Sequence, residues 1–267
     1  MNYKDNIKKI NDKLDLVYET AYDKGYQTGY GESYDKGFDK GFIDGKQAEY
    51  DKFWDIVQEN GKRENYQSVF CQNAWKDEMF YPKYDFVPTR ANAMFQYSSL
   101  TTLASKLKQQ GIKLDTSKLT GTLAIQMFQG SNIKDIPEMD LRNCINIGYI
   151  FGSNAKVETI EKFIISEQAN TGLGTCFMQA YDLKHCIFDG VLAITGMDLH
   201  WSTLLDKESI ISLVNILSTT TSGLTVTLSL QAVNKAFETS ENAKDGSNST
   251  EWQTLVNTKQ NWTINLS

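Results

Sequence analysis

The chain has few of the residues on which most catalytic and metal sites depend. Its 267 residues include only two histidines and four cysteines, and no two cysteines have the C-x-x-C spacing of zinc ribbons and redox motifs. The nucleotide-binding, serine-hydrolase and zinc-protease motifs G-x-x-x-x-G-K-[ST], G-x-S-x-G and H-E-x-x-H are missing too. We therefore predict no enzyme activity, no catalytic residue, no cofactor and no metal. We interpret Cys71, Cys144, Cys176 and Cys186 as buried thiols.

Two further groups of residues allow a chemical interpretation that we consider weaker than packing or solvation. His185 and Cys186 could form a nucleophilic pair, but adjacent residues on a strand point to opposite faces. Asp135, Glu138 and Asp140 could form a carboxylate cluster, but solvated turn residues between repeats are the stronger interpretation. We therefore assign no catalytic role to either group.

Basic excess and long apolar runs are also lacking. The 27 Lys and Arg residues against 33 Asp and Glu residues give a formal charge of -6, so no overall basic field attracts nucleic acid. No eighteen consecutive residues are apolar, and the first residues lack the apolar segment of a signal peptide. These features predict a protein made in the cytoplasm, with no nucleic-acid partner and no membrane insertion.

Prolines are scarce, and two of the three mark a change along the chain. Pro82 and Pro88 bracket residues 83–87, where the preference of pre-proline residues for extended backbone ends any helix arriving from upstream. We therefore place the main boundary near residue 90. The predicted segments are a helical oligomerisation or docking rod (1–46), a helical hairpin and extended linker (47–90), a repeat domain (91–205) and a C-terminal cap (206–267). The two helices of the hairpin are expected at 46–60 and 63–78.

Two patterns predict the N-terminal rod. Ile7, Ile10, Leu14 and Val17 are spaced by three and four residues, which places them on one stripe of a helix and indicates a short coiled-coil seam. An aromatic residue and a small residue, mostly glycine, then alternate with a period of four. The positions of this repeat that we assign to oligomerisation or docking are Tyr22, Gly25, Tyr26, Gly29, Tyr30, Tyr34, Gly37, Phe38, Gly41, Phe42 and Gly45.

The glycines of this repeat make an isolated helix unfavourable. Each glycine in a helix interior costs about 1 kcal/mol relative to alanine, so the rod needs a neighbouring chain that packs closely against it. We expect a homo-oligomer, with a homotrimer as the symmetry of a fibre. A flexible tract rich in glycine and tyrosine is the alternative that the composition leaves open.

A short phrase that contains phenylalanine recurs through the middle of the chain. Phe95, Phe128, Phe151 and Phe177 follow one another at intervals of 33, 23 and 26 residues, in or near the range of roughly 20–29 residues found in leucine-rich repeats. The longest interval requires an insertion, which we place around residues 106–119. Each unit pairs a ring with a short alternating apolar segment that must stack on its neighbours, which predicts an irregular solenoid.

The residues around these phenylalanines resemble a known family. Phe128 is followed by Ile133 and Ile136, and segments such as Leu183-Lys184-His185-Cys186 look like a strand with an Asn/Cys element. On this basis the chain resembles the BspA-like leucine-rich repeat proteins, whose units carry the pattern Ala-Phe-x-x-Cys-x-x-Leu-x-x-Ile. The chain departs from that pattern because other residues replace the alanine.

The last segment predicts a cap. Asp206 is a plausible helix N-cap, an amphipathic helix follows it, and residues 224–230 alternate as a strand does. We expect Trp252 and Trp262 to pack inside this segment rather than to bind sugar. Residues 206–267 also look like the C-terminal cap of leucine-rich repeat proteins encoded by phages and prophages of gut Gram-positive bacteria.

These observations together predict an α+β fold. It comprises a helical, coiled-coil rod with glycine-aromatic repeats, a short irregular leucine-rich repeat solenoid and a C-terminal α/β cap. The resemblance implies a structural protein of a phage virion, in a tail or fibre, with partners among other copies of itself, other virion proteins and a host envelope component. A bacterial cell-surface adhesion or protein-interaction module is the alternative.

Overall fold

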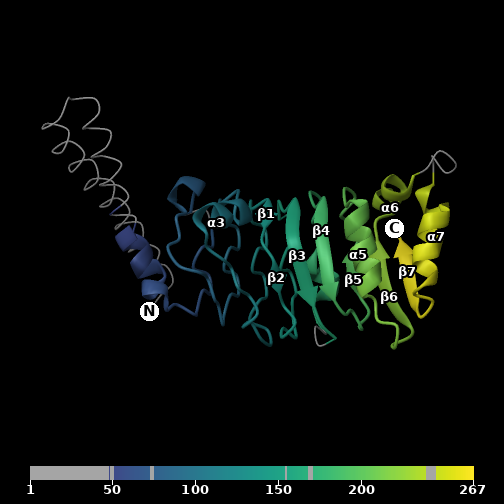
Figure 1. The fold of residues 1–267 in the computed structure, drawn as a ribbon, viewed down its shortest axis with the longest axis horizontal. Coiled ribbons are helices and arrows are strands. Elements are labelled where there is room, and N and C mark those ends of the chain that lie inside the picture. The colour runs from purple at the N-terminus through teal and green to yellow at the C-terminus, as the bar shows by residue number, and fades with distance from the viewer. Residues whose placement is uncertain (1–47, 49–50, 73–74, 154, 168–170, 239–244) are drawn as a thin grey trace, which may run out of the picture. The chain divides into compact units, whose positions relative to one another are not determined.

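The computed structural model describes residues 48, 51–72, 75–153, 155–167, 171–238 and 245–267 (Figure 1). The chain divides into two compact units, Met1–Arg63 with Tyr81–Asp85 and Glu64–Phe80 with Phe86–Ser267. The boundary predicted near residue 90 falls within the second unit. The predicted seam and glycine-aromatic repeat, from Ile7 to Gly45, lie outside the described residues.

The described part of the first unit is a helical segment that is hydrogen-bonded to the separate segment Tyr81–Asp85. Residues 51–57 are helical, and the 3-10 helix η1 (Glu59–Gly61) follows them. The buried side chain of Gln58 accepts hydrogen bonds from the N–H groups of Lys83 and Tyr84 and donates one to the Tyr84 carbonyl oxygen. One amide side chain thus satisfies three backbone groups of Tyr81–Asp85, and these hydrogen bonds hold that segment against the helical segment.

A continuous stack of buried phenylalanine rings forms the core of the second unit. The centroids of successive rings are 5.1, 5.2, 5.6 and 5.3 Å apart, and the angles between ring planes are 15°, 4°, 12° and 26°. The rings belong to Phe70, Phe95, Phe128, Phe151 and Phe177. Four of them are the phenylalanines singled out by the sequence phrase, and Phe70 adds one more. We call the chain segment around each ring, and each later segment that continues the stacking, a layer.

The backbone of each layer is bonded to the next in a constant register. The N–H of Phe95 donates to the carbonyl oxygen of Met127, and the N–H of Phe128 donates to that of Ile150, at 2.7 and 2.9 Å. Two residues after each ring the backbone has a positive φ between 53° and 63°, so every layer turns at the same place. These turn residues are Gln72, Tyr97, Gly130, Ser153 and Gln179.

This register overturns the second helix of the predicted hairpin, residues 63–78. The N–H groups of Tyr66, Ser68, Phe70 and Gln72 donate to carbonyl oxygens of the next layer rather than to the residue four positions earlier. Within the described part of 63–78, only the short 3-10 helix η2 (Asp77–Met79) begins. The apolar residues of this segment are spaced for packing between layers. Hydrogen bonds to the next layer form here instead of helical ones, so the predicted helix is wrong.

Parallel strands line one side of the middle layers. The strands are β1 (Asp135–Ile136), β2 (Met139–Asp140), β3 (Thr159–Ile165) and β4 (His185–Gly190). Both β1 and β2 pair with β3, and β4 pairs with it as well. Pro137 lies between β1 and β2 and has no N–H to donate, which accounts for the interruption of the ladder there.

The last layers combine a second parallel sheet with helices. The strands β5 (Met197–Leu199), β6 (Leu224–Leu228) and β7 (Trp262–Leu266) pair in that order, and the helices are α5 (Lys207–Ile216), α6 (Leu230–Phe237) and α7 (Thr250–Asn257) (Figure 1). The predicted N-cap is confirmed, because the Asp206 carboxylate accepts the N–H of Ser209 at 2.9 Å. The predicted strand ends at Leu228 because Ser229 caps α6. Trp252 and Trp262 are buried, as expected.

Candidate binding groove beside helix α3

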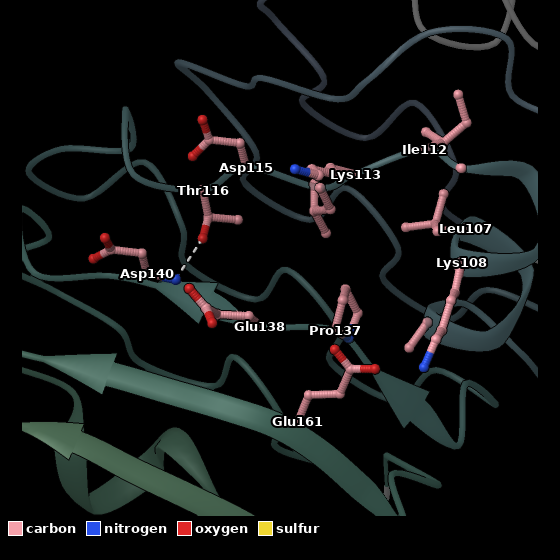
Figure 2. A pocket seen from close by; sticks show the side chains of 13 residues that line it. Leu107, Lys108, Ile112, Lys113, Asp115, Thr116, Pro137, Glu138, Asp140 and Glu161 are labelled. Atoms are coloured by element: carbon pink, nitrogen blue, oxygen red, sulfur yellow. Dashed lines mark hydrogen bonds between the residues drawn. The ribbon is translucent and has the colours of Figure 1, made fainter.

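The insertion predicted around residues 106–119 builds the wall of a groove. Its helix α3 (Ala104–Gln110) ends at Gly111, which has the positive φ of 69° common at helix C-termini. The chain then returns through residues 112–116, where Leu114 bridges to Phe86. A groove of about 600 Å³ lies between this insertion and β2. Figure 2 shows the side chains that line it.

Asp135, one of the three carboxylates considered in the sequence, accepts hydrogen bonds at the N-terminus of helix α3. Its two oxygens accept the N–H groups of Leu103 and Ser105, at 2.5 and 2.8 Å. A carboxylate at this position satisfies donors of the first turn and favours the positive end of the helix dipole. Asp135 therefore has a structural role and is not among the residues that line the groove.

The floor of the groove is apolar, and its α3 side is basic. Leu107 and Leu114 are buried, and Ile112 is half-buried. Lys108 and Lys113 lie on the same wall and are exposed. A ligand in the groove would therefore contact hydrocarbon in the middle and ammonium groups along one side.

Four carboxylates from three consecutive layers line the groove. They are Asp115, Glu138, Asp140 and Glu161. The sequence drew attention to Glu138 and Asp140 but missed Asp115 and Glu161. Glu161 follows Ile160, which is in register with Ile136 on the adjacent strand, so only the strand pairing brings it to this place. No local pattern in the sequence marked it.

The four carboxylates differ in how far their charge is already balanced. Arg142 contacts both oxygens of Asp140, at 3.0 and 2.6 Å, and this interaction lowers the pKa of that carboxyl. Asp115 accepts hydrogen bonds from Ser117. Glu161 is exposed and has no salt-bridge partner among the described residues. Glu161 and the exposed Glu138, whose nearest lysine nitrogen is 3.9 Å away, are thus the carboxylates best placed to meet a cation.

The four cysteines and His185 form no nucleophilic Cys–His pair among the described residues. All four cysteines are buried, as predicted. Burial raises the pKa of Cys144 to about 12 and raises the pKa of Cys176 and Cys186 as well, which keeps these thiols protonated. His185 is half-exposed and bonded to Asp206 at 2.7 Å, whereas the adjacent Cys186 is buried, in accord with opposite faces of β4.

Within the described ranges, no group of three or more His, Cys, Asp or Glu side chains is arranged to hold a metal ion. No helix of that part of the chain is both long and apolar enough to cross a bilayer. The chain matches no protein-family model, no curated protein and no solved structure. The residues assigned to oligomerisation or docking lie outside the described residues, so the geometry on which a function can be argued is that of the groove.

Proposed function

We propose that the chain is a non-enzymatic structural component of a phage virion, in a tail or fibre, that attaches to a partner through its layered unit. In this proposal the layers form a short leucine-rich repeat solenoid, and the N-terminal rod anchors and oligomerises the protein. The resemblance of the phenylalanine phrase to BspA-like leucine-rich repeat proteins, and of residues 206–267 to the cap of phage-encoded ones, supports the virion assignment. The constant interior of the layers supports the solenoid, because their outer residues can vary without disturbing the core.

The groove beside α3 is the observation that carries the attachment function. Side chains of three layers, one of which carries the insertion, converge on it, and it combines an apolar floor with exposed carboxylates and with the exposed Lys108 and Lys113 on the α3 side. Such a surface suits recognition of a segment that has a hydrophobic group next to a cation. A host envelope component or another virion protein with these features would fit it.

Binding of the full chain to cell walls of gut Gram-positive bacteria tests this function. Replacing Glu138 and Glu161 by glutamine removes the two carboxylates and preserves their shape. Two ion pairs worth about 0.2–1 kcal/mol each correspond to a loss of about two- to thirtyfold in affinity. The matched control replaces the exposed Glu64 and Glu208 by glutamine, which changes the net charge equally. Equal binding by both double variants would contradict attachment through the groove.

The anchoring role of the rod has a separate test. Deletion of residues 1–46 should remove assembly through the rod and leave the cooperative thermal unfolding of the layered unit unchanged. Light scattering measures the mass, and circular dichroism measures the melting. Loss of the cooperative transition in the shortened chain would contradict a division of labour between rod and layers.

A further inference from the structure

Strand β7 is the outer strand of its sheet in the part of the chain that the structure describes, and only Trp262 of its five residues is buried. Its inward side chains extend two rows of register-matched residues. The rows are Met197, Val226 and Ile264, and Leu199, Leu228 and Leu266. The first two members of each row are at most 1% exposed, whereas Ile264 and Leu266 are half-buried. The apolar interior therefore continues to the outer side of β7, where no further strand pairs with it among the described residues.

The α7 and β7 layer also presents almost no charge. Charged residues make up 22% of the chain, but residues 250–267 contain only Glu251 and Lys259. Glu251 pairs with Lys207 of α5 at 2.6 Å. Lys259 is buried and donates to the carbonyl oxygens of Asn215 and Leu217, at the end of the same helix. Both charges are thus engaged with the preceding layer.

The edge of β7 lacks the features that keep exposed strand edges apart. Soluble proteins protect such edges with lysine, proline or a bulge. β7 contains neither lysine nor proline, and its pairing with β6 runs through five consecutive residue pairs without a register shift. An edge without lysine, proline or a bulge, beside a half-buried apolar face, is of the kind that pairs with another strand.

The sequence of β7 is complementary to itself in an antiparallel pair. If a two-fold axis passes through Ile264, Ile264 lies opposite Ile264 of a second copy, and Trp262 lies opposite Leu266. Residues 262, 264 and 266 share the inward face, so apolar side chains meet across the junction, while Thr263 meets Asn265 on the outer face. A shift of one residue would place the apolar face against the polar one.

We propose that the outer edge of β7 is a two-fold interface between two copies of this chain, joined as an antiparallel strand pair centred on Ile264. A two-fold contact of this kind is closed and uses the same surface on both copies. The interface is independent of the proposed rod. A rod that does not self-associate would yield a dimer, and a rod that forms trimers would yield a hexamer where the three edges of one trimer pair with those of a second.

The solution mass of the full chain tests the interface whatever the rod does. Ile264→Lys places two ammonium groups opposite each other on the axis and should halve the mass measured by light scattering. Ile145→Lys is the matched control, because Ile145 is an exposed isoleucine of a different layer, and it should leave the mass unchanged. Circular dichroism melting verifies that both variants fold. An Ile264→Lys protein with the mass of the unchanged chain would overturn the proposal, whether β7 is free or receives a strand of another protein.

Cross-linking supplies a test that does not depend on a disruptive variant. Ile264→Cys places two thiols opposite each other at the spacing of a facing strand pair, so mild oxidation should yield a covalent dimer on a non-reducing gel. The native cysteines are buried and should not contribute. Thr263→Cys is the control, since two copies of residue 263 lie diagonally, about 7–8 Å apart, and should not link. Failure of Ile264→Cys to link, or equal linking by Thr263→Cys, would overturn the register.

Discussion

The phenylalanine layers and the layers of β5, β6 and β7 fill the same kind of interior in different ways. In the former, a stacked ring runs through each level with further buried rings beside it, such as Phe163 and Phe188. Successive stacked rings from Phe128 to Phe177 are 23 and 26 residues apart. In the latter, smaller aliphatic rows take that place, and the register-matched residues Met197, Val226 and Ile264 are 29 and 38 residues apart. The additional length forms helices α5, α6 and α7, whose buried faces supply the missing volume.

The difference teaches that layer length follows the element that closes the layer, because every interval of 29 residues or more contains a helix, including the 33-residue interval from Phe95 to Phe128 with its helix α3. A buried aromatic ring covers a large apolar area by itself, so short turns suffice to close the chain around it. An aliphatic row needs a second apolar surface, which an amphipathic helix provides. Each helix also has N–H and carbonyl groups at its ends that lack a partner within the helix and need hydrogen bonds from elsewhere.

The largest expected effect comes from removing a ring within the stack. Phe128→Ala should cost about 3–5 kcal/mol, because it leaves a cavity between the rings of Phe95 and Phe151. Urea unfolding followed by circular dichroism measures the loss. Tyr97→Ala is the control, since that ring is 48% exposed. A similar loss of unfolding free energy in both variants would show that stacked rings stabilise the protein no more than exposed rings do.

Two glycines at the junction between the two kinds of layer allow the cost of backbone strain to be measured apart from the cost of a steric clash. Gly190 and Gly196 have φ values of 95° and 103°. A Cβ at position 190 would lie 1.9 Å from the carbonyl oxygen of Ile165, whereas no atom lies within 4 Å at position 196. Gly196→Ala should cost the strain alone, about 1–3 kcal/mol, and Gly190→Ala should cost more because β3 and β4 must move apart. Equal midpoints in urea would show that the close contact relaxes freely.

A smaller effect is expected where the helical layers satisfy a helix end. Lys259→Met should destabilise the protein by about 1–3 kcal/mol, because it leaves the carbonyl oxygens of Asn215 and Leu217 without their buried donor. Lys235→Met, at an exposed position of α6, serves as the control. Equal unfolding free energies for the two variants would mean that water replaces the lysine at the end of α5.

The smallest effect concerns the salt bridge at the rim of the groove. Hydrogen bonding with Arg142 lowers the pKa of Asp140 in the folded state, so the pair contributes stability above the unfolded pKa of about 4 and loses it as the pH falls through the lower folded value. Asp140→Asn should therefore cost about 0.2–1 kcal/mol at pH 7 and less at pH 3. Urea unfolding at both pH values measures the difference. A cost that grows toward low pH would contradict the assigned pair.

Local patterns were sufficient for much of the second unit. The recurrence of Phe95, Phe128, Phe151 and Phe177 predicted residues that do stack, because large apolar side chains at similar intervals must be buried together. The N-cap at Asp206 was readable because a capping side chain acts within three residues. The buried thiols followed from the lack of any paired spacing.

Other features were decided only when the layers came together. Residues 63–78 have apolar spacing compatible with a helix, but their N–H groups find acceptors in the next layer. Glu161 and Asp115 reach the groove through strand register and through the path of an insertion. The half-covered edge of β7 is visible only against the buried rows beside it.

The sequence by itself thus determined which side chains are buried and where some elements begin, because burial and capping depend on residue type and on neighbours a few positions away. The tertiary structure alone decided which backbone groups pair, which carboxylates converge and which strand is the outer one of its sheet among the described residues. Those outcomes depend on partners more than twenty residues distant, whose register no local pattern specifies.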